Sequence, residues 1–275
     1  MREVLARLRV PAAILAAMVI VALSPACAKK RKEAQAQIPP EQIYQEALHK
    51  IAKKHYYTAR FLLQKVVPRI APEDRDLLPR VQLAIAEAYF KDGGLLNYGE
   101  SLNGFRNFLT YFPDHKQADY AQYMVGMSLF KQVLAPDRDQ ALTLKAIDEF
   151  RKVETVYPDS PHVADARRRI DDCYDQLAEH ERMIGRFYQK RRRWLAAIDR
   201  YRVVLEKYPR FKSTNLLLFD LGRCQLEAGQ REEAEATYGR LWNDDPNGKL
   251  GRKAKKILEQ HEREQEKQWG KKTGS

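Results

Sequence analysis

Residues that carry catalysis or bind metals are scarce in this sequence, and none of them falls into a catalytic motif. The six histidines show no His-x-x-x-His spacing and the three cysteines form no Cys-x-x-Cys pair, so no metal site is predicted. There is no glycine-rich phosphate loop, and the segment 99–104 (GESLNG) lacks the spacing of a nucleophile elbow. These absences argue against an enzyme and predict no cofactor.

Long apolar runs are also scarce, and the clearest one lies at the start of the chain. Residues 10–23 are apolar, follow a short basic stretch, and are too few to span a bilayer comfortably. Small residues then lead to Cys27, an order typical of a secretory signal. Because a cysteine follows directly, residues 1–26 resemble a bacterial lipoprotein signal, with Cys27 as the lipid-bearing first residue. An uncleaved anchor, or an ordinary signal beside a chance cysteine, is the alternative.

The region after Cys27 is basic, and so is the whole chain. Residues 27–39 read as a flexible basic tether close to the membrane. A net charge of +12 favours acidic partners, anionic lipid headgroups or nucleic acid. The export signal argues against nucleic acid, since it removes the chain from the cytoplasm. A solvated surface rich in lysine and arginine is the alternative explanation.

The body of the chain carries an internal repeat. A small residue is followed four positions later by an aromatic residue and eight positions after that by proline. The small residue lets two helices approach, the aromatic fills the gap between them, and the proline ends the helix. This is the second helix of a tetratricopeptide repeat, and it occurs as Ser101/Phe105/Pro113, Ala146/Phe150/Pro158, Ala197/Tyr201/Pro209 and Ala234/Tyr238/Pro246.

With a degenerate first repeat that begins near Tyr44, the pattern predicts an all-α tetratricopeptide-repeat superhelix of about five helix pairs. Segment 133–143 is an insertion in the third repeat. Apolar spacing predicts one long helix from His162 to about Lys190. We expect it to join an amino-terminal lobe, residues 40–160, to a carboxy-terminal lobe, residues 161–249. Residues 250–275 should form a charged helix that fades into a disordered end.

Stacked helix pairs leave a concave surface, and the repeat offsets predict which side chains line it. In the first three repeats these are large and apolar, which suits an extended peptide with apolar side chains. An aromatic stripe at helical spacing is also typical of a core, so this alternative stays open. The candidate groove residues are Tyr44, Leu48, Phe90, Tyr120, Tyr123, Met127 and Phe130.

The same offsets carry charge in the fourth repeat. They place Arg182 and Arg186 on the inner face, followed by the basic run 190–193. Arginine forms bidentate hydrogen bonds with carboxylates and often contributes much of the binding energy at an interface, so these residues are candidates for docking a partner. A solvated charged face is the alternative.

Several segments closely resemble the BamD family, the tetratricopeptide lipoproteins of the outer-membrane β-barrel assembly machine. The resemblance covers most of residues 40–210 and is weaker in residues 40–75. It is carried by 119–126 (DYAQYMVG), 137–140 (DRDQ), 157–160 (YPDS), 164–167 (ADAR), 177–181 (LAEHE) and 194–198 (WLAAI).

The resemblance implies an outer-membrane location on the periplasmic side. It implies that the amino-terminal repeats receive unfolded outer-membrane proteins by an aromatic-ended terminal strand. The carboxy-terminal repeats would dock on the barrel-forming, BamA-like subunit, alongside other assembly lipoproteins. Arg200 matches a family arginine that faces that subunit, and Arg191 is carried over with it.

Three further questions stay open from the sequence. Cys173 and Cys224 could form a disulfide in an oxidising compartment, but they lie in different repeats, which favours buried free thiols. Another tetratricopeptide lipoprotein, one that helps secretin or pilus assembly, is an alternative, although such proteins tend to lack large insertions. A cell-envelope coordinating protein or a cell-wall enzyme would need a wall-binding module or a catalytic acid, and the sequence shows no recognisable motif for either.

Overall fold

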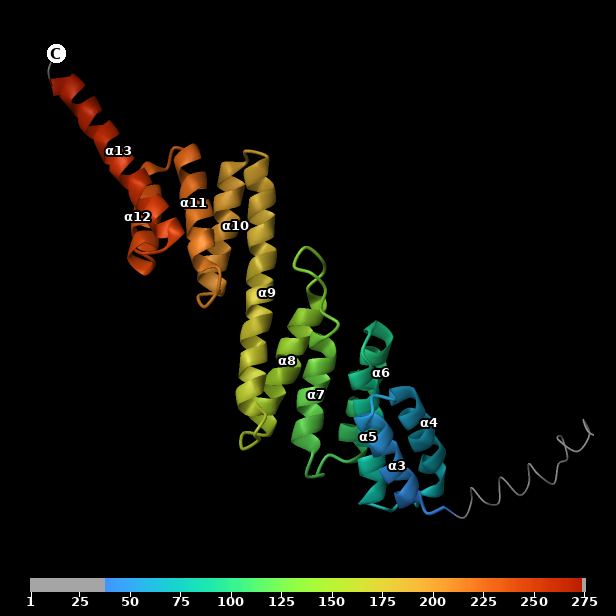
Figure 1. Ribbon diagram of the computed structural model, residues 1–275. Coiled ribbons are helices and arrows are strands. Elements are labelled where there is room, and N and C mark those ends of the chain that lie inside the picture. The colour runs from blue at the N-terminus through green and yellow to red at the C-terminus, as the bar shows by residue number, and fades with distance from the viewer. Residues whose placement is uncertain (1–37, 274–275) are drawn as a thin grey trace, which may run out of the picture. The chain divides into compact units, whose positions relative to one another are not determined.

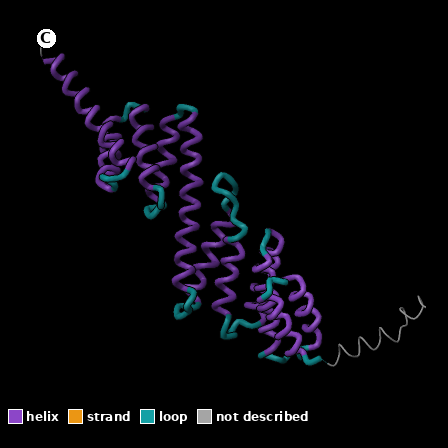
Figure 2. The backbone as a smooth tube through the Cα atoms, viewed as in Figure 1, coloured by secondary structure: helices purple, strands orange, loops and turns teal. Residues whose placement is uncertain are grey.

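The computed structural model describes residues 38–273, and every regular element among them is helical (Figures 1 and 2). The expected all-α repeat fold is therefore confirmed. The described residues form two compact units, which divide between Asp92 and Gly93. Cys27 and the expected signal peptide lie outside the described residues, as do residues 274 and 275. Within the described range, no helix has both the length and the apolar character that a membrane span requires.

Unit 1 contains the first repeat and the first helix of the second. Its elements are α3 (Pro40–Ala52), α4 (Tyr56–Val66), a short 3-10 turn (Val67–Arg69) and α5 (Leu77–Asp92). Helix α4 packs against both α3 and α5. Ala47, Ala59 and Leu63 are fully buried in the core that these helices share, so the degenerate first repeat forms the helix pair that its spacing predicts.

Unit 2 begins at Gly93 and contains eight helices, each of which packs against the next in the sequence. Three helices come before the long helix α9 (Val163–Lys190), and its partner α10, two shorter helices and a basic helix follow it. The other elements are α6 (Leu95–Tyr111), α7 (Ala118–Phe130), α8 (Ala141–Val156), α10 (Trp194–Lys207), α11 (Thr214–Glu227), α12 (Arg231–Asp244) and α13 (Lys249–Thr273).

Glycine and an aromatic ring set the contact within three of these pairs. A Cβ atom added to Gly126 would lie 2.6 Å from the Phe150 ring, and one added to Gly185 would lie 2.4 Å from the Tyr201 ring. The equivalent distance from Gly222 to the Tyr238 ring is 2.8 Å. All three rings are almost fully buried. The two helices of each pair therefore approach more closely than any residue with a side chain would allow.

The repeat prolines end the second helices at the same place in each pair. Helices α6, α8, α10 and α12 all stop two residues before proline. The residue between leaves the helical region, since Tyr208, for example, has φ −129° and ψ 63°. Proline disfavours the α conformation of the residue before it, which explains the common end point.

The long helix α9 is confirmed over the expected range, and it lies wholly within unit 2. Its first half contacts α8, with Arg167 paired to Glu154 at 2.6 Å. Its second half contacts α10, where Gly185 meets Tyr201. Because one continuous helix holds both neighbours, the lobe boundary expected after residue 160 falls inside unit 2, and the compact units divide earlier in the chain.

Candidate functional site

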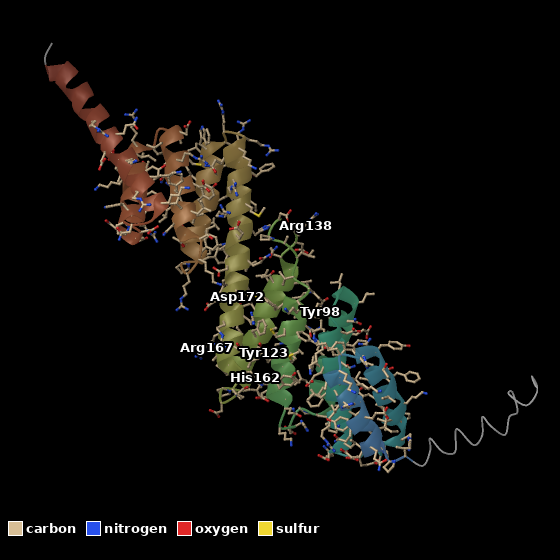
Figure 3. The ribbon with its side chains drawn as sticks, in the orientation of Figure 1. Tyr98, Tyr123, Arg138, His162, Arg167 and Asp172 are labelled. Carbon is tan, nitrogen blue, oxygen red and sulfur yellow. The ribbon has the colours of Figure 1, made fainter. Side chains whose placement is uncertain are left out.

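Helix α7 presents the aromatic residues expected in the groove, and α9 covers part of them. Tyr123 is only 9% exposed, and its ring stacks on His162 at the start of α9 with centroids 5.2 Å apart (Figure 3). Burial raises the pKa of the Tyr123 hydroxyl. The Arg169 guanidinium lies 5.5 Å from the centre of the Phe130 ring. Tyr120, Met127 and Phe130 are half-buried, so this face belongs partly to the core and is partly open to solvent.

The other three groove residues lie in unit 1. Tyr44 is buried in the core, where the Arg80 guanidinium lies 5.1 Å from its ring centre and burial raises the pKa of its hydroxyl. Leu48 is half-buried against the same core, and Phe90 is half-buried near the end of α5. The seven expected groove residues are thus divided between the two units.

Arg182 is 6% exposed and acts inside unit 2. Its guanidinium donates two hydrogen bonds to Glu179, at 2.8 and 2.6 Å, and one of its nitrogens lies 3.6 Å from the Asp220 carboxylate of α11. The hydrogen bond to Glu179 is the main reason why the pKa of Arg182 is raised. Arg182 therefore links α9 to α11, and its positive charge is balanced within the fold by Glu179 and Asp220.

Arg200 lies on α10 and is half-exposed. Its guanidinium donates a hydrogen bond of 3.0 Å to Glu181 of α9. An exposed ion pair of this kind contributes little to stability, on the order of 0–1 kcal/mol, so a partner carboxylate could compete for the arginine at small cost.

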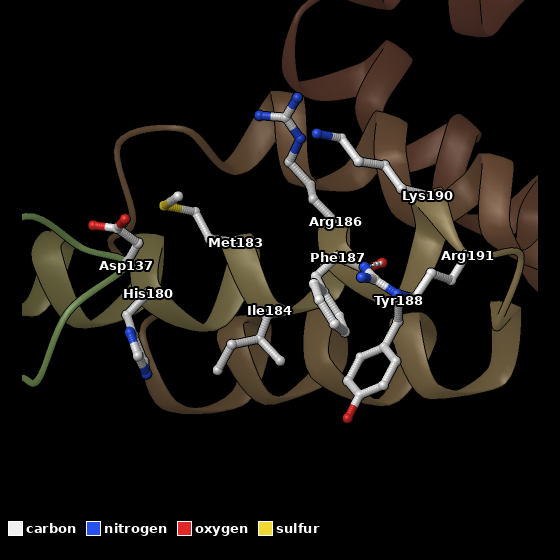
Figure 4. Close-up of a pocket in the computed structure, with 9 residues that line it drawn as sticks. All are labelled: Asp137, His180, Met183, Ile184, Arg186, Phe187, Tyr188, Lys190 and Arg191. Atoms are coloured by element: carbon white, nitrogen blue, oxygen red, sulfur yellow. Dashed lines mark hydrogen bonds between the residues drawn. The ribbon is translucent and has the colours of Figure 1, made fainter.

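The second half of α9 carries a surface cavity of about 580 Å³ (Figure 4). Apolar side chains line it, with Met183 37% and Phe187 50% exposed. The Arg191 guanidinium lies 3.5 Å from the centre of the Phe187 ring, close enough for a cation–π contact. Asp137 of the insertion reaches the same cavity. The lining residues are Asp137, His180, Met183, Ile184, Arg186, Phe187, Tyr188, Lys190 and Arg191.

The insertion is fastened along α9 by hydrogen bonds to its backbone carbonyls. Gln176 donates to the Leu134 carbonyl at 2.8 Å, and a ring nitrogen of His180 lies 2.5 Å from the Pro136 carbonyl. Gln140 holds the loop internally through the Ala135 and Arg138 carbonyls. The loop therefore borders the α9 cavity at a fixed place.

The repeat offsets predicted Arg186 as a candidate, the family resemblance implied Arg191, and both line this cavity. Neither the offsets nor the resemblance predicted Met183 or Phe187. The sequence signal was available in the spacing of His180, Met183 and Phe187, which places them on one helix face.

The two cysteines of the described chain form no disulfide. Cys173 and Cys224 are free and fully buried, and burial raises the pKa of each thiol to about 12. The expectation of buried free thiols is confirmed. Among the described residues, no group of histidine, cysteine, aspartate and glutamate has a geometry that could hold a metal ion.

Helix pairs locked by glycine and an aromatic ring, with proline after each second helix, define a tetratricopeptide-repeat protein. The model of the YfiO family, described as outer membrane lipoprotein, matches residues 36–239. This chain belongs to that family.

Curated relatives agree with the resemblance seen in the sequence. The chain is 31% identical over 228 residues to the outer membrane protein assembly factor BamD of Caulobacter vibrioides, covering 82% of this chain and 73% of the relative. It is 26% identical over 237 residues to BamD of Rickettsia prowazekii, covering 86% and 92%. Among solved structures, it is similar to the TPR2AB domain of yeast Sti1 in complex with an Hsp90 peptide, with 14% identity, coverage of 82% and 84%, and a TM-score of 0.42.

Proposed function

We propose that this chain is a non-catalytic scaffold of the outer-membrane protein assembly machinery. Family membership and relatives named as assembly factors support this proposal. The chain would be attached by lipid on Cys27 to the periplasmic face of the outer membrane. Its repeats would hold unfolded outer-membrane proteins and a barrel-forming subunit close together.

One observation carries the docking part of the proposal, namely the exposed face of α9 around Phe187. An aromatic ring that is half exposed on a helix, beside Met183, offers apolar surface to a partner. Covering such a side chain contributes on the order of 1–3 kcal/mol. Arg186, Lys190 and Arg191 surround it and would select a partner surface with carboxylates.

The expected docking arginines would then have different tasks. Arg186 and Arg191 would contact the partner at the cavity, and Arg200 would exchange Glu181 for a partner carboxylate. Arg182 would keep α9 and α11 in place beneath them.

The test of docking is co-purification from gently solubilised membranes. We expect Phe187→Glu to reduce recovery of the barrel-forming subunit at least tenfold, because a buried carboxylate beside an apolar partner surface is unfavourable. Leu144→Glu, an equally exposed change on α8, is the matched control and should leave recovery unchanged. Equal recovery with both variants would refute docking at this face.

The substrate part of the proposal rests on the half-buried residues of the groove. Tyr120, Met127 and Phe130 would contact apolar side chains of an unfolded outer-membrane protein, with Tyr123 holding the face in place against His162. In unit 1 the half-buried Leu48 and Phe90 would make such contacts, with the buried Tyr44 supporting them from the core.

The substrate test is a fluorescence titration with the terminal peptide of an outer-membrane β-barrel protein. We expect Tyr120→Ala with Met127→Ala to weaken binding about fivefold or more, because apolar contact area is lost. The control is Tyr111→Ala, which removes an exposed tyrosine from α6. Unchanged affinity in a folded double variant would contradict this use of α7.

A further inference from the structure

A second hollow in unit 2 lies on the other side of the Arg186 and Lys190 row, between α9 and α11. It measures about 360 Å³, and Arg192 of the turn from α9 to α10 is among its lining residues. Trp194, the first residue of α10, is half-buried in its wall. The lining residues are Arg186, Gln189, Lys190, Arg192, Trp194, Arg223 and Glu227. We refer to this hollow as the α9–α11 groove.

The α9–α11 groove is strongly cationic. Four of its lining residues are basic, and Glu227 is the one acidic member of the set. Among the residues that the structure describes, no carboxylate forms an ion pair with Arg186, Lys190 or Arg192. Nearby Glu179 is already engaged by Arg182. The charges of Arg186, Lys190 and Arg192 are therefore available to pair with the carboxylates of a ligand.

The one paired cation of the groove is held in a fixed orientation. Arg223 donates to Asp220 at 3.3 Å. Gln189 is 8% exposed. With its side-chain amide flipped, the amide nitrogen donates to the Tyr201 hydroxyl at 2.8 Å and the amide oxygen accepts from Arg223 Nε at 3.0 Å. A side chain that is oriented beforehand loses less entropy on binding, so Arg223 is prepared to meet a carboxylate.

Arg192 has a backbone conformation that favours glycine. Its φ is 56°, in the left-handed region. The same turn position holds Lys54 in the first repeat, Gly93 in the second and Gly229 in the fifth, all with positive φ. The left-handed turn is thus a feature of the repeat, and a residue with a side chain is strained there. At this turn, the strained residue is an arginine that faces the groove.

We propose that the α9–α11 groove binds an acidic segment of another protein. The net charge of the chain is +12 and residues 29–32 (KKRK) are basic, so the charge balance favours an occupant supplied by another protein. For the same reason a second copy would be repelled. The groove is a hollow between two helices with Trp194 in its wall, which fits a polypeptide with carboxylates and an apolar side chain better than the flat surface of a bilayer.

The groove shares Arg186 and Lys190 with the α9 cavity, whereas Arg192, Trp194 and Arg223 line the groove alone. The test therefore uses Arg192→Gly combined with Arg223→Gln. Arg192→Gly relieves backbone strain, and because Arg223→Gln removes contacts with Asp220 and Gln189, a urea-unfolding midpoint within the range of the control variant is required before a loss of binding is assigned to the groove. The charge-matched control is Arg202→Gln with Arg210→Gln, two exposed arginines outside the groove.

The probe is a fluorescein-labelled nonapeptide that repeats glutamate, leucine and aspartate, titrated against full-length protein in detergent by fluorescence anisotropy. A peptide with glutamine and asparagine in the acidic positions is the comparison. We expect binding of the acidic peptide alone, with affinity that falls as salt rises. The groove variant should bind about tenfold more weakly, since two charge pairs are lost, and the control should bind within about twofold of the unaltered protein.

Equal affinities of groove and control variants would overturn the proposal, and so would equal binding of the neutral peptide. Sedimentation with vesicles of phosphatidylglycerol and phosphatidylethanolamine provides the membrane comparison. Vesicle binding that falls in the groove variant while peptide binding does not would assign the groove to lipid and overturn the proposal. Phe187→Glu should keep peptide binding, so failure of this proposal can be told apart from failure of docking at α9.

Discussion

Replacing Gly185 with alanine should destabilise the protein, although alanine is the better helix former. The new Cβ would lie 2.4 Å from Cε1 and 2.7 Å from Cδ1 of Tyr201, whereas carbon atoms in contact lie about 3.5–4.0 Å apart. Tyr201 is fully buried and its hydroxyl is bonded to Gln189 at 2.8 Å, so the ring has little room to withdraw. Overpacking costs about 1–3 kcal/mol.

Because the ring has little room to withdraw, the overpacking cost should lie at the upper end of its range, and after alanine's helix preference returns about 1 kcal/mol the net loss should be about 2 kcal/mol. Gly239 provides the opposite case within the same unit. It lies inside α12, and a Cβ there would meet nothing within 4 Å. Gly239→Ala should therefore stabilise the protein by about 0.5–1 kcal/mol.

Urea unfolding followed by far-ultraviolet circular dichroism measures both variants against the unaltered protein. The midpoint should fall for Gly185→Ala and rise for Gly239→Ala. If Gly185→Ala unfolded at the same urea concentration as the unaltered protein, the claim that this glycine is required by the close approach of α9 and α10 would be refuted.

Three further outcomes are expected. Arg192→Gly should raise the thermal midpoint by about 1–4 °C in a calorimetric scan, because a left-handed arginine is relieved, and an unchanged midpoint would count against strain at this turn. Cys173 and Cys224 are buried and each thiol has a pKa of about 12, so neither should react with a thiol reagent at pH 8 in the native protein. Both should react in guanidinium, and mass spectrometry maps the labelled sites. Rapid labelling of the native protein would contradict their burial. Arg182→Ala should lower stability by about 2–4 kcal/mol in urea, since acidic partners lose a buried counter-charge, and a loss below 1 kcal/mol would show that the pairing with Glu179 is not structural.

Spacing within the sequence was enough to predict the helix pairs, because each pair depends on a few residues at fixed offsets. A small residue at Ala197, an aromatic at Tyr201 and a proline at Pro209 act locally, through helix approach and helix termination. The long helix α9 was predictable for a similar reason, since its apolar stripe continues without proline. These features need no knowledge of distant contacts.

The surfaces were less predictable, because they depend on what covers each helix. Offsets assign Arg182 to the inner face, but α11 brings Asp220 towards it and buries it. The offsets make no prediction for Phe187, and its ring proves to be half exposed. The left-handed turn at Arg192 is likewise invisible until the other repeats are aligned by structure.

Because α9 is one continuous helix, its length fixes the rotation about its axis between the helices that pack on its first half and those that pack on its second half. Its 28 residues extend about 42 Å, and one added residue would turn everything beyond it by about 100°. Arg167 could then not face α8 while Gly185 faced α10. Insertions and deletions in this helix should therefore be tolerated only near its ends or in sets that restore the phase.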